Sequence, residues 1–152
     1  MFKVTGDVIK SCQESTRCGC YVGPVDIVCI MTVFKQTAVC FDFIAKSGFD
    51  GTVKVGIGNY CFSRTDEASL KRILVLGLVK QADELLDSVS VLVHNMLVAQ
   101  SEPGGVKVMN RSPTCLNQLN LDYVQEAIAS FKKLFRLISE YFGGKDSDRG
   151  SI

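Results

Sequence analysis

Apolar and polar side chains alternate along much of residues 1–62, as they do in strands that bury one face. Within this region, residues 25–34 are apolar at almost every position, which is typical of a strand buried on both faces. The β-rich run 38–45 and the alternating run 52–62 flank an Asp-Gly pair that suits a hairpin turn. Together with the alternating start of the chain, these runs predict about four strands in a largely antiparallel sheet.

After Ser63 the apolar spacing changes from two residues to three and four, the repeat of a helix with one buried face. Polar residues at this change, among them Thr65 and Asp66, are typical helix N-caps. The pattern predicts a long helix over residues 66–99 and a second helix over residues 121–142, which Gly-Gly ends.

These elements predict an α+β fold in a single domain over residues 1–144. In this fold the antiparallel sheet of about four strands, residues 1–62, packs against the helices 66–99 and 121–142. The polar end of the chain, 145–152, is expected to be a disordered tail.

The predicted long helix suggests that the protein is an oligomer. A helix over residues 66–99 would be about 51 Å long, whereas a compact chain of this size has a diameter of about 38 Å. Apolar side chains that extend beyond the domain need a partner subunit. We therefore expect a homo-oligomer, most simply a homodimer. Its interface is expected on the apolar stripe of this helix, at Leu78, Leu85, Val89, Leu92 and Met96.

The composition indicates the cellular compartment of the protein more clearly than its function. The formal net charge is only +1, so no overall field indicates a nucleic acid or a membrane surface as partner. No secretory signal pattern stands at the start, and no uncharged apolar run reaches the roughly 20 residues of a membrane span. The seven cysteines are an odd number, which favours free thiols in a reducing compartment. A cytoplasmic protein without a membrane partner is expected, of cellular or viral origin.

Catalytic and cofactor chemistry is hard to place in this sequence. The single histidine, His94, falls on the polar side of the predicted long helix, where a surface position is expected. Gly56-Ile57-Gly58 lacks the third glycine of a dinucleotide fingerprint, because Cys61 stands in its place. We therefore expect a non-enzymatic protein that uses no cofactor.

Three cysteines lie close together in the polar segment 11–20, which predicts a loop. Cys12, Cys18 and Cys20 could contribute to a zinc site or a reactive thiol site. However, the sequence contains no Cys-x-x-Cys pair, and the expected state is free thiols without a metal. A zinc or thiol protein is the weakest of the alternatives.

The strand 52–62 offers a candidate binding face. Its outward positions are flat in the middle, aromatic at one end and basic at both ends. Exposed aromatic rings beside cations are typical of surfaces that stack and neutralise single-stranded nucleic acid. The candidate residues on this strand and its basic rim are Lys54, Tyr60, Phe62, Arg64, Lys46, Lys71 and Arg72.

Single-stranded RNA or DNA binding through the sheet face is thus the first functional hypothesis. The main alternative is a protein–protein adaptor or chaperone-like module that uses apolar helix or strand faces. A basic trio on the polar side of the last helix, Lys132, Lys133 and Arg136, is interpreted as an ordinary solvated face.

Overall fold

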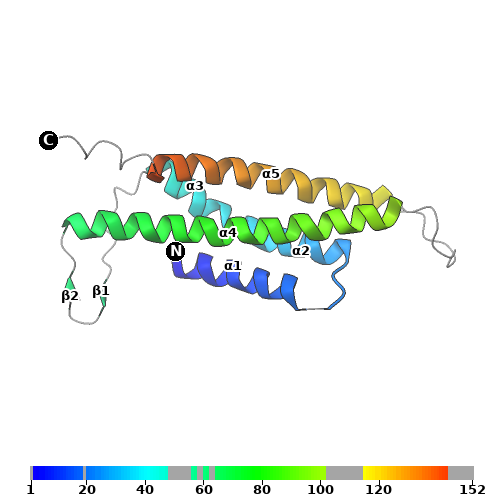
Figure 1. Ribbon diagram of the computed structural model, residues 1–152, viewed down its shortest axis with the longest axis horizontal. Coiled ribbons are helices and arrows are strands. Elements are labelled where there is room, and N and C mark those ends of the chain that lie inside the picture. The colour runs from blue at the N-terminus through cyan, green and yellow to red at the C-terminus, as the bar shows by residue number, and fades with distance from the viewer. Residues whose placement is uncertain are drawn as a thin grey trace.

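The computed structural model is a helical bundle (Figure 1). It describes residues 2–18, 20–47, 56–57, 60–61, 64–101 and 115–143. Of these, Phe2, Ser47 and residues 56–57, 60–61, 64–68, 99–101 and 115–117 are described by their backbone alone. The helices are α1 (Phe2–Arg17), α2 (Pro24–Lys35), α3 (Ala38–Ser47), α4 (Arg64–Ser101) and α5 (Cys115–Gly143).

The helices form a closed ring in the order α1, α2, α5 and α4, with α3 continuing α2 along α5. In Figure 1, α1 and α4 run from left to right, and α2, α3 and α5 run from right to left. The hairpin α1–α2 therefore lies beside the hairpin α4–α5, with parallel helices facing each other across the two hairpins. In this ring α2 and α3 lie across the diagonal from α4, although α3 and α4 follow each other in the chain.

The predicted α+β fold is wrong. Within the described residues, the β-structure consists of the antiparallel pair β1 (Gly56–Ile57) and β2 (Tyr60–Cys61), in place of a four-stranded sheet. The three segments expected as the first strands are the helices α1, α2 and α3. The segment 11–20, expected as a loop, is helical as far as Arg17. The predicted tail, 145–152, lies outside the described residues.

The buried side chains of the first 47 residues follow a helical repeat. In α2 the residues at 0% exposure are Ile27, Met31 and Phe34, spaced four and three apart. In α1 the buried positions Thr5, Ile9 and Cys12 have the same spacing. Each helix turns these positions toward the bundle centre, whereas a strand would send alternate positions there.

Local signals start and end α2. Pro24 occupies its first turn, where the missing N–H costs nothing, and the Asp26 carboxylate accepts the Gly23 N–H at 2.8 Å. At the other end, the N–H groups of Gln36 and Thr37 donate to the carbonyls of Val33 and Phe34, three residues back. This tight turn separates α2 from α3 and leaves both helices on the same side of α5.

The predicted helix 66–99 lies within α4, which runs through Gly77 without a break. Its apolar stripe is buried by the chain's own helices, because α1 and α5 pack on it from two sides. Leu85 and Val89 are fully buried, Leu78 is 7% exposed, and Leu92 and Met96 are partly buried against the same core. The three buried residues are therefore not available to a partner subunit, whereas the oligomeric state of the protein stays a prediction.

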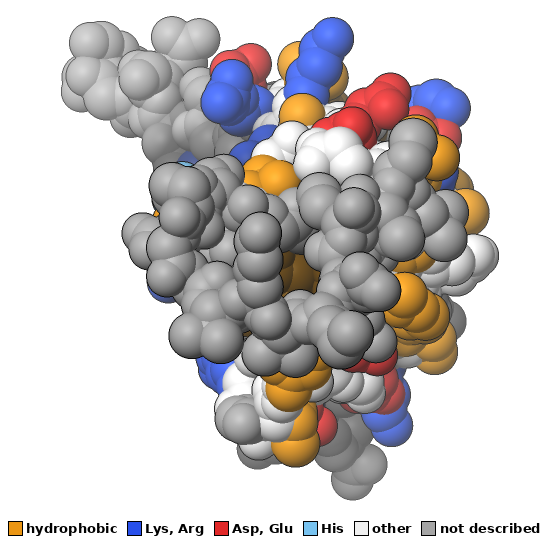
Figure 2. Space-filling view, turned by 90° about the vertical axis from the view of Figure 1, so that its right-hand side faces the viewer, with side chains coloured by type: hydrophobic (Ala, Val, Ile, Leu, Met, Phe, Trp, Pro, Cys, Tyr) orange, Lys and Arg blue, Asp and Glu red, His pale blue; other side chains and the backbone are white. Residues whose placement is uncertain are grey.

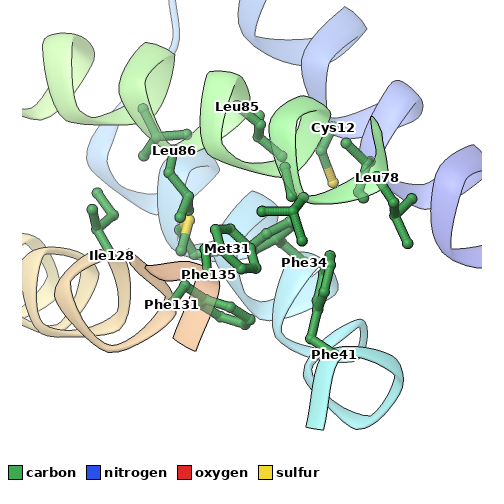
Figure 3. Close-up of a cluster of buried hydrophobic side chains, with 14 of the residues drawn as sticks. Cys12, Met31, Phe34, Phe41, Leu78, Leu85, Leu86, Ile128, Phe131 and Phe135 are labelled. Carbon is green, nitrogen blue, oxygen red and sulfur yellow. The ribbon is translucent and has the colours of Figure 1, made fainter. Parts of the chain in front are cut away.

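The predicted helix 121–142 lies within α5, which begins six residues earlier, at Cys115. Its buried residues complete the core: Leu121, Val124, Ile128, Phe131, Phe135 and Ile138. Figure 3 shows side chains of all five helices converging there, including Cys12 of α1 and Met31 of α2. The core therefore forms between the two hairpins.

Replacing Leu85 with Ala should lower the free energy of unfolding by about 2–5 kcal/mol, because the change leaves a cavity at a fully buried site. The matched control is Leu137→Ala on the exposed face of α5, which should change stability by less than about 0.5 kcal/mol. Urea unfolding followed by circular dichroism measures both. A Leu85→Ala chain with full stability but weakened self-association would restore the interface assignment.

Candidate functional site

The structure does not assemble the predicted nucleic-acid face, because the described residues form only the two-stranded pair β1–β2 in place of a four-stranded sheet. Lys54 and Phe62 lie outside those residues, and Tyr60 in β2 and Arg64 at the start of α4 are described by their backbone alone. Lys46 is on α3, where it pairs with Asp42 at 2.6 Å. The remaining two rim residues, in the second and third turns of α4, are Lys71 and Arg72.

Arg72 makes a hydrogen bond within the fold. Arg72 Nη2 donates to the Gly143 carbonyl at 3.4 Å, which joins α4 to the last residue of α5. Lys71 and Arg72 are half-buried rather than displayed on a flat surface. The binding of single-stranded nucleic acid therefore stays a prediction. The described residues do not form the sheet face from which it was inferred.

The polar side of α4 and α5 holds an ion-pair cluster. Lys132 reaches from α5 to Asp87, and its Nζ lies 3.7 Å from Asp83 on α4. The hydrogen bond to Asp87 raises the pKa of Lys132, although burial partly opposes this. Lys132 is therefore a link between helices, whereas Lys133, Arg136 and His94 are exposed, as expected.

The cysteines separate into buried and exposed groups. Cys12 is 3% exposed, its thiol lies 3.9 Å from the Ile30 carbonyl oxygen, and burial raises its pKa. Cys40 is buried, but Cys29 is exposed, because α2 turns it outward. In the described part of the chain no three metal-binding side chains gather. Of the three cysteines in the predicted site, Cys12 is buried, and Cys18 and Cys20 are both exposed.

The most unusual surface of the bundle lies on α2 and α3. Opposite the buried side of these helices, a row of exposed positions continues from one helix to the other across the turn. We call this row the outer α2–α3 face; it consists of Cys29, Val33, Gln36, Val39 and Phe43. Val33 and Phe43 are each 51% exposed and Val39 is 69% exposed. A helix that is apolar on both faces is normally covered on both.

Other apolar side chains reach the surface as well. At the end of the bundle where α2 begins, orange side chains lie among acidic and basic ones (Figure 2). Most of these are scattered singly, which is normal for a protein surface. The outer α2–α3 face differs because its positions recur at helical spacing along one line.

The positions of the outer α2–α3 face are symmetric about Gln36. Val33 and Val39 lie three residues on either side of it, and Cys29 and Phe43 lie seven on either side. Ten residues away on either side are Asp26 and Lys46, both exposed and opposite in charge. The sequence analysis missed this face, since residues 25–34 were interpreted as a strand.

A hollow of about 270 Å³ lies between α5 and the junction of α2 with α3. Lys35 and Ala38 line it from one side, and Tyr123, Ala127 and Phe131 line it from α5. The Lys35 ammonium lies 5.4 Å from the centre of the Tyr123 ring, a cation–π arrangement. The lining suits an apolar side chain with a polar tip.

The segment Pro24–Lys46 is long and apolar enough to cross a membrane, by length and composition alone. It comprises α2, the turn and α3. Ile27, Met31, Phe34, Phe41 and Ile44, on its inner side, belong to the core of the bundle. Comparison with known proteins adds no further guide: no protein-family model matches the chain, and no curated protein or solved structure matches it significantly.

Replacing Lys132 with Met should lower the free energy of unfolding by about 0.2–1 kcal/mol near neutral pH, the usual value of exposed ion pairs. Because the pKa of Lys132 is raised, its contribution is present below the ordinary lysine pKa and is lost as pH rises through the folded value. The difference from the parent chain should therefore vanish at strongly alkaline pH. Urea unfolding at both pH values, with Lys133→Met as control, measures it; an equal effect of both substitutions would contradict the assignment.

Proposed function

We propose that this chain is a non-enzymatic protein-interaction module that self-associates through its outer α2–α3 face. The observation that carries the proposal is the exposure of Val33, Val39 and Phe43 on helices whose opposite side is already buried in the core. Apolar area removed from water contributes roughly 25 cal/mol per Å². Covering this face is therefore favourable, and the bundle itself does not cover it.

The symmetry of the face favours a second copy of the same chain as its occupant. In a two-fold dimer each contact between different residues occurs twice, so the surface must complement itself. If two copies cross antiparallel with their Gln36 residues at the axis, Val33 of one copy meets Val39 of the other. Cys29 then meets Phe43, and Asp26 approaches Lys46 of the second copy. Every position on the face thus has a matching partner.

The charges on the same helices support a protein partner over a lipid surface. Asp26 and Asp42 balance Lys35 and Lys46, so anionic headgroups would gain no net attraction. Helices that lie on membranes usually carry an excess of Lys and Arg on their polar face. In addition, the inner side of α2 and α3 packs on α5, so only the outer side of these helices is available to a partner.

Glutamate at both Val33 and Val39 should weaken dimerisation by at least about tenfold, which corresponds to about 1.4 kcal/mol. The reason is that carboxylates would be buried against apolar side chains without a partner. Helix formation is not impaired, because glutamate is a better helix former than valine. Sedimentation velocity over a concentration series measures the change, and Val91→Glu on the exposed side of α4 is the matched control.

Three results would overturn the proposal. The parent chain could remain a monomer at high concentration. The control could weaken association as much as the double variant. Alternatively, the parent chain could stay monomeric but bind lipid vesicles in a manner that the double variant loses, which would assign the face to a membrane.

A charge-exchange experiment tests the antiparallel register. Asp26→Lys alone would place lysine opposite Lys46 of the second copy, and Lys46→Asp alone would place aspartate opposite Asp26. Each variant should self-associate less than the parent chain, because like charges meet twice in each dimer. Mixing the two variants should restore association, since both contacts then join opposite charges.

Circular dichroism of each variant provides the folding control, because Asp26 also accepts the Gly23 N–H at the start of α2. Analytical ultracentrifugation of the single variants and of their equimolar mixture provides the measurement. A mixture that associates no better than its components would refute the register while leaving the apolar face to be judged by the glutamate variants.

A further inference from the structure

A second hollow lies between α4 and α5. Its volume is about 440 Å³, within the range of about 300–1,000 Å³ that is typical of small-molecule sites. Along the two helices its lining falls between two polar links. On one side Arg72 donates to the Gly143 carbonyl, and on the other Lys132 contacts Asp83 and Asp87. These links hold α4 and α5 in one register, so the hollow is a preformed feature of the fold.

Cationic and apolar side chains line this hollow together. Lys80 of α4 and Arg136 of α5 bring positive charge to it from opposite helices, and both are exposed. Lys132 supplies a third cation and Ser139, which is half-buried, supplies a hydroxyl group. The apolar part of the lining consists of Leu76, Val79 and Phe135. The hollow therefore offers hydrogen-bond donors and an apolar wall to the same ligand.

Two of the three cations are not compensated by the fold. Lys132 is balanced by the aspartates of α4. Lys80 and Arg136, by contrast, form no ion pair with any residue that the structure describes. Lys132 and Arg136 also lie four residues apart on α5, a spacing at which like charges repel each other. An anion between Lys80 and Arg136 would satisfy both cations and reduce this repulsion.

From this arrangement we infer that the α4–α5 hollow binds a small organic phosphate, a phosphate monoester on an apolar body. A phosphate monoester carries a charge of about −1.5 to −2 near pH 7 and three acceptor oxygens. Arg136 can bind two of these oxygens at once, and Lys80 adds a point charge from the other helix. Ser139 is the third donor. A carboxylate has two oxygens and a single charge, so it matches this set of donors less well.

The acidic residues of the lining limit the size of the anion. Asp83 lies beside Lys132, and Glu140 lies about two helical turns further along α5. Three cationic side chains against two carboxylates leave the lining with a small positive charge. One phosphate group fits between the acids, whereas a long polyanion would meet both of them. The inference is independent of the proposed dimer, whose face lies on α2 and α3.

Titration of the ¹⁵N-labelled full-length chain with phenyl phosphate, followed by the amide chemical shifts, tests the inference. Saturable shifts are expected along residues 76–83 and 132–140. Inorganic phosphate should bind at the same place about tenfold more weakly, because it leaves the apolar wall in contact with water. Benzyl alcohol, which lacks the charge, should produce no saturable shift. The absence of saturation with phenyl phosphate, or shifts centred on other residues, would overturn the inference.

Charge-removing variants identify the cations that bind the phosphate. Lys80→Gln and Arg136→Gln should each weaken the binding of phenyl phosphate about tenfold, because each removes a hydrogen bond between charged groups. The matched control is Lys133→Gln, an exposed position of α5 outside the lining, which should bind as the parent chain does. Circular dichroism checks the fold of each variant. Equal losses in Lys133→Gln and Arg136→Gln would overturn the inference, as would tighter binding of a single-stranded oligonucleotide that needs the same two cations.

Flotation with vesicles separates two sources of a phosphate monoester. Phosphatidylcholine vesicles with and without phosphatidic acid are compared for the parent chain and for Arg136→Gln. Binding of phenyl phosphate without flotation is the expected result, and it assigns the hollow to a soluble ester. Flotation that needs phosphatidic acid and is lost in Arg136→Gln would assign the same phosphate site to a lipid headgroup.

Discussion

Four phenylalanine rings hold α5 against α2 and α3, and the rest of the bundle depends on this contact. The ring centroids of Phe34 and Phe131 lie 4.6 Å apart, and those of Phe41 and Phe135 lie 4.7 Å apart. Phe131 and Phe135 also contact each other, at 5.8 Å. Tilted aromatic pairs at such distances add about 0.5–1.5 kcal/mol each beyond the apolar area that they bury. The cluster therefore joins the amino-terminal hairpin to the carboxy-terminal hairpin.

This contact also determines which side of α2 and α3 is free. Once Phe34 and Phe41 face α5, the helical repeat directs Val33, Val39 and Phe43 away from the core. The turn at Gln36 and Thr37 lets α2 and α3 both follow α5 while their buried sides and their exposed sides stay aligned. The candidate dimer face is thus a geometric consequence of the aromatic cluster, since rotating α2 to cover the face would remove its phenylalanine from the core.

The sequence predicts α4 and α5 well because their apolar residues recur on one side and polar residues fill the other. The first 47 residues resist this approach, because residues 25–34 are apolar at almost every position and the flanking runs fit a two-residue repeat as easily as a helical one. One local signal was available in the Gly23-Pro24 pair followed by Asp26, which starts α2. Strand propensity outweighed it, and tertiary packing on α5 decided the outcome.

The candidate sites were predictable to different degrees. Cys18 and Cys20 stand out by their spacing alone, but only the fold shows that Cys12 is buried away from them. The outer α2–α3 face could not be found while its residues were assigned to strands, since the symmetry about Gln36 has meaning only on a helix. The stripe on α4 was recognised correctly as apolar. Its occupant was misjudged, because one sequence does not show whether a helix or a second subunit covers a stripe.

The connection between α3 and α4 divides the chain into two halves that share one core. Each half is a simple helical hairpin with local contacts, yet the shared core lies between them. A hairpin alone would leave its apolar side in water, so neither half is expected to persist without the other. Folding must then bring α1 to α4 across long stretches of sequence, as between Gln13 and Gln81, which lie 68 positions apart. Cutting the chain between Ser47 and Arg64 would leave the five described helices intact, which makes this bundle a natural candidate for a split protein whose two fragments report their own reassembly.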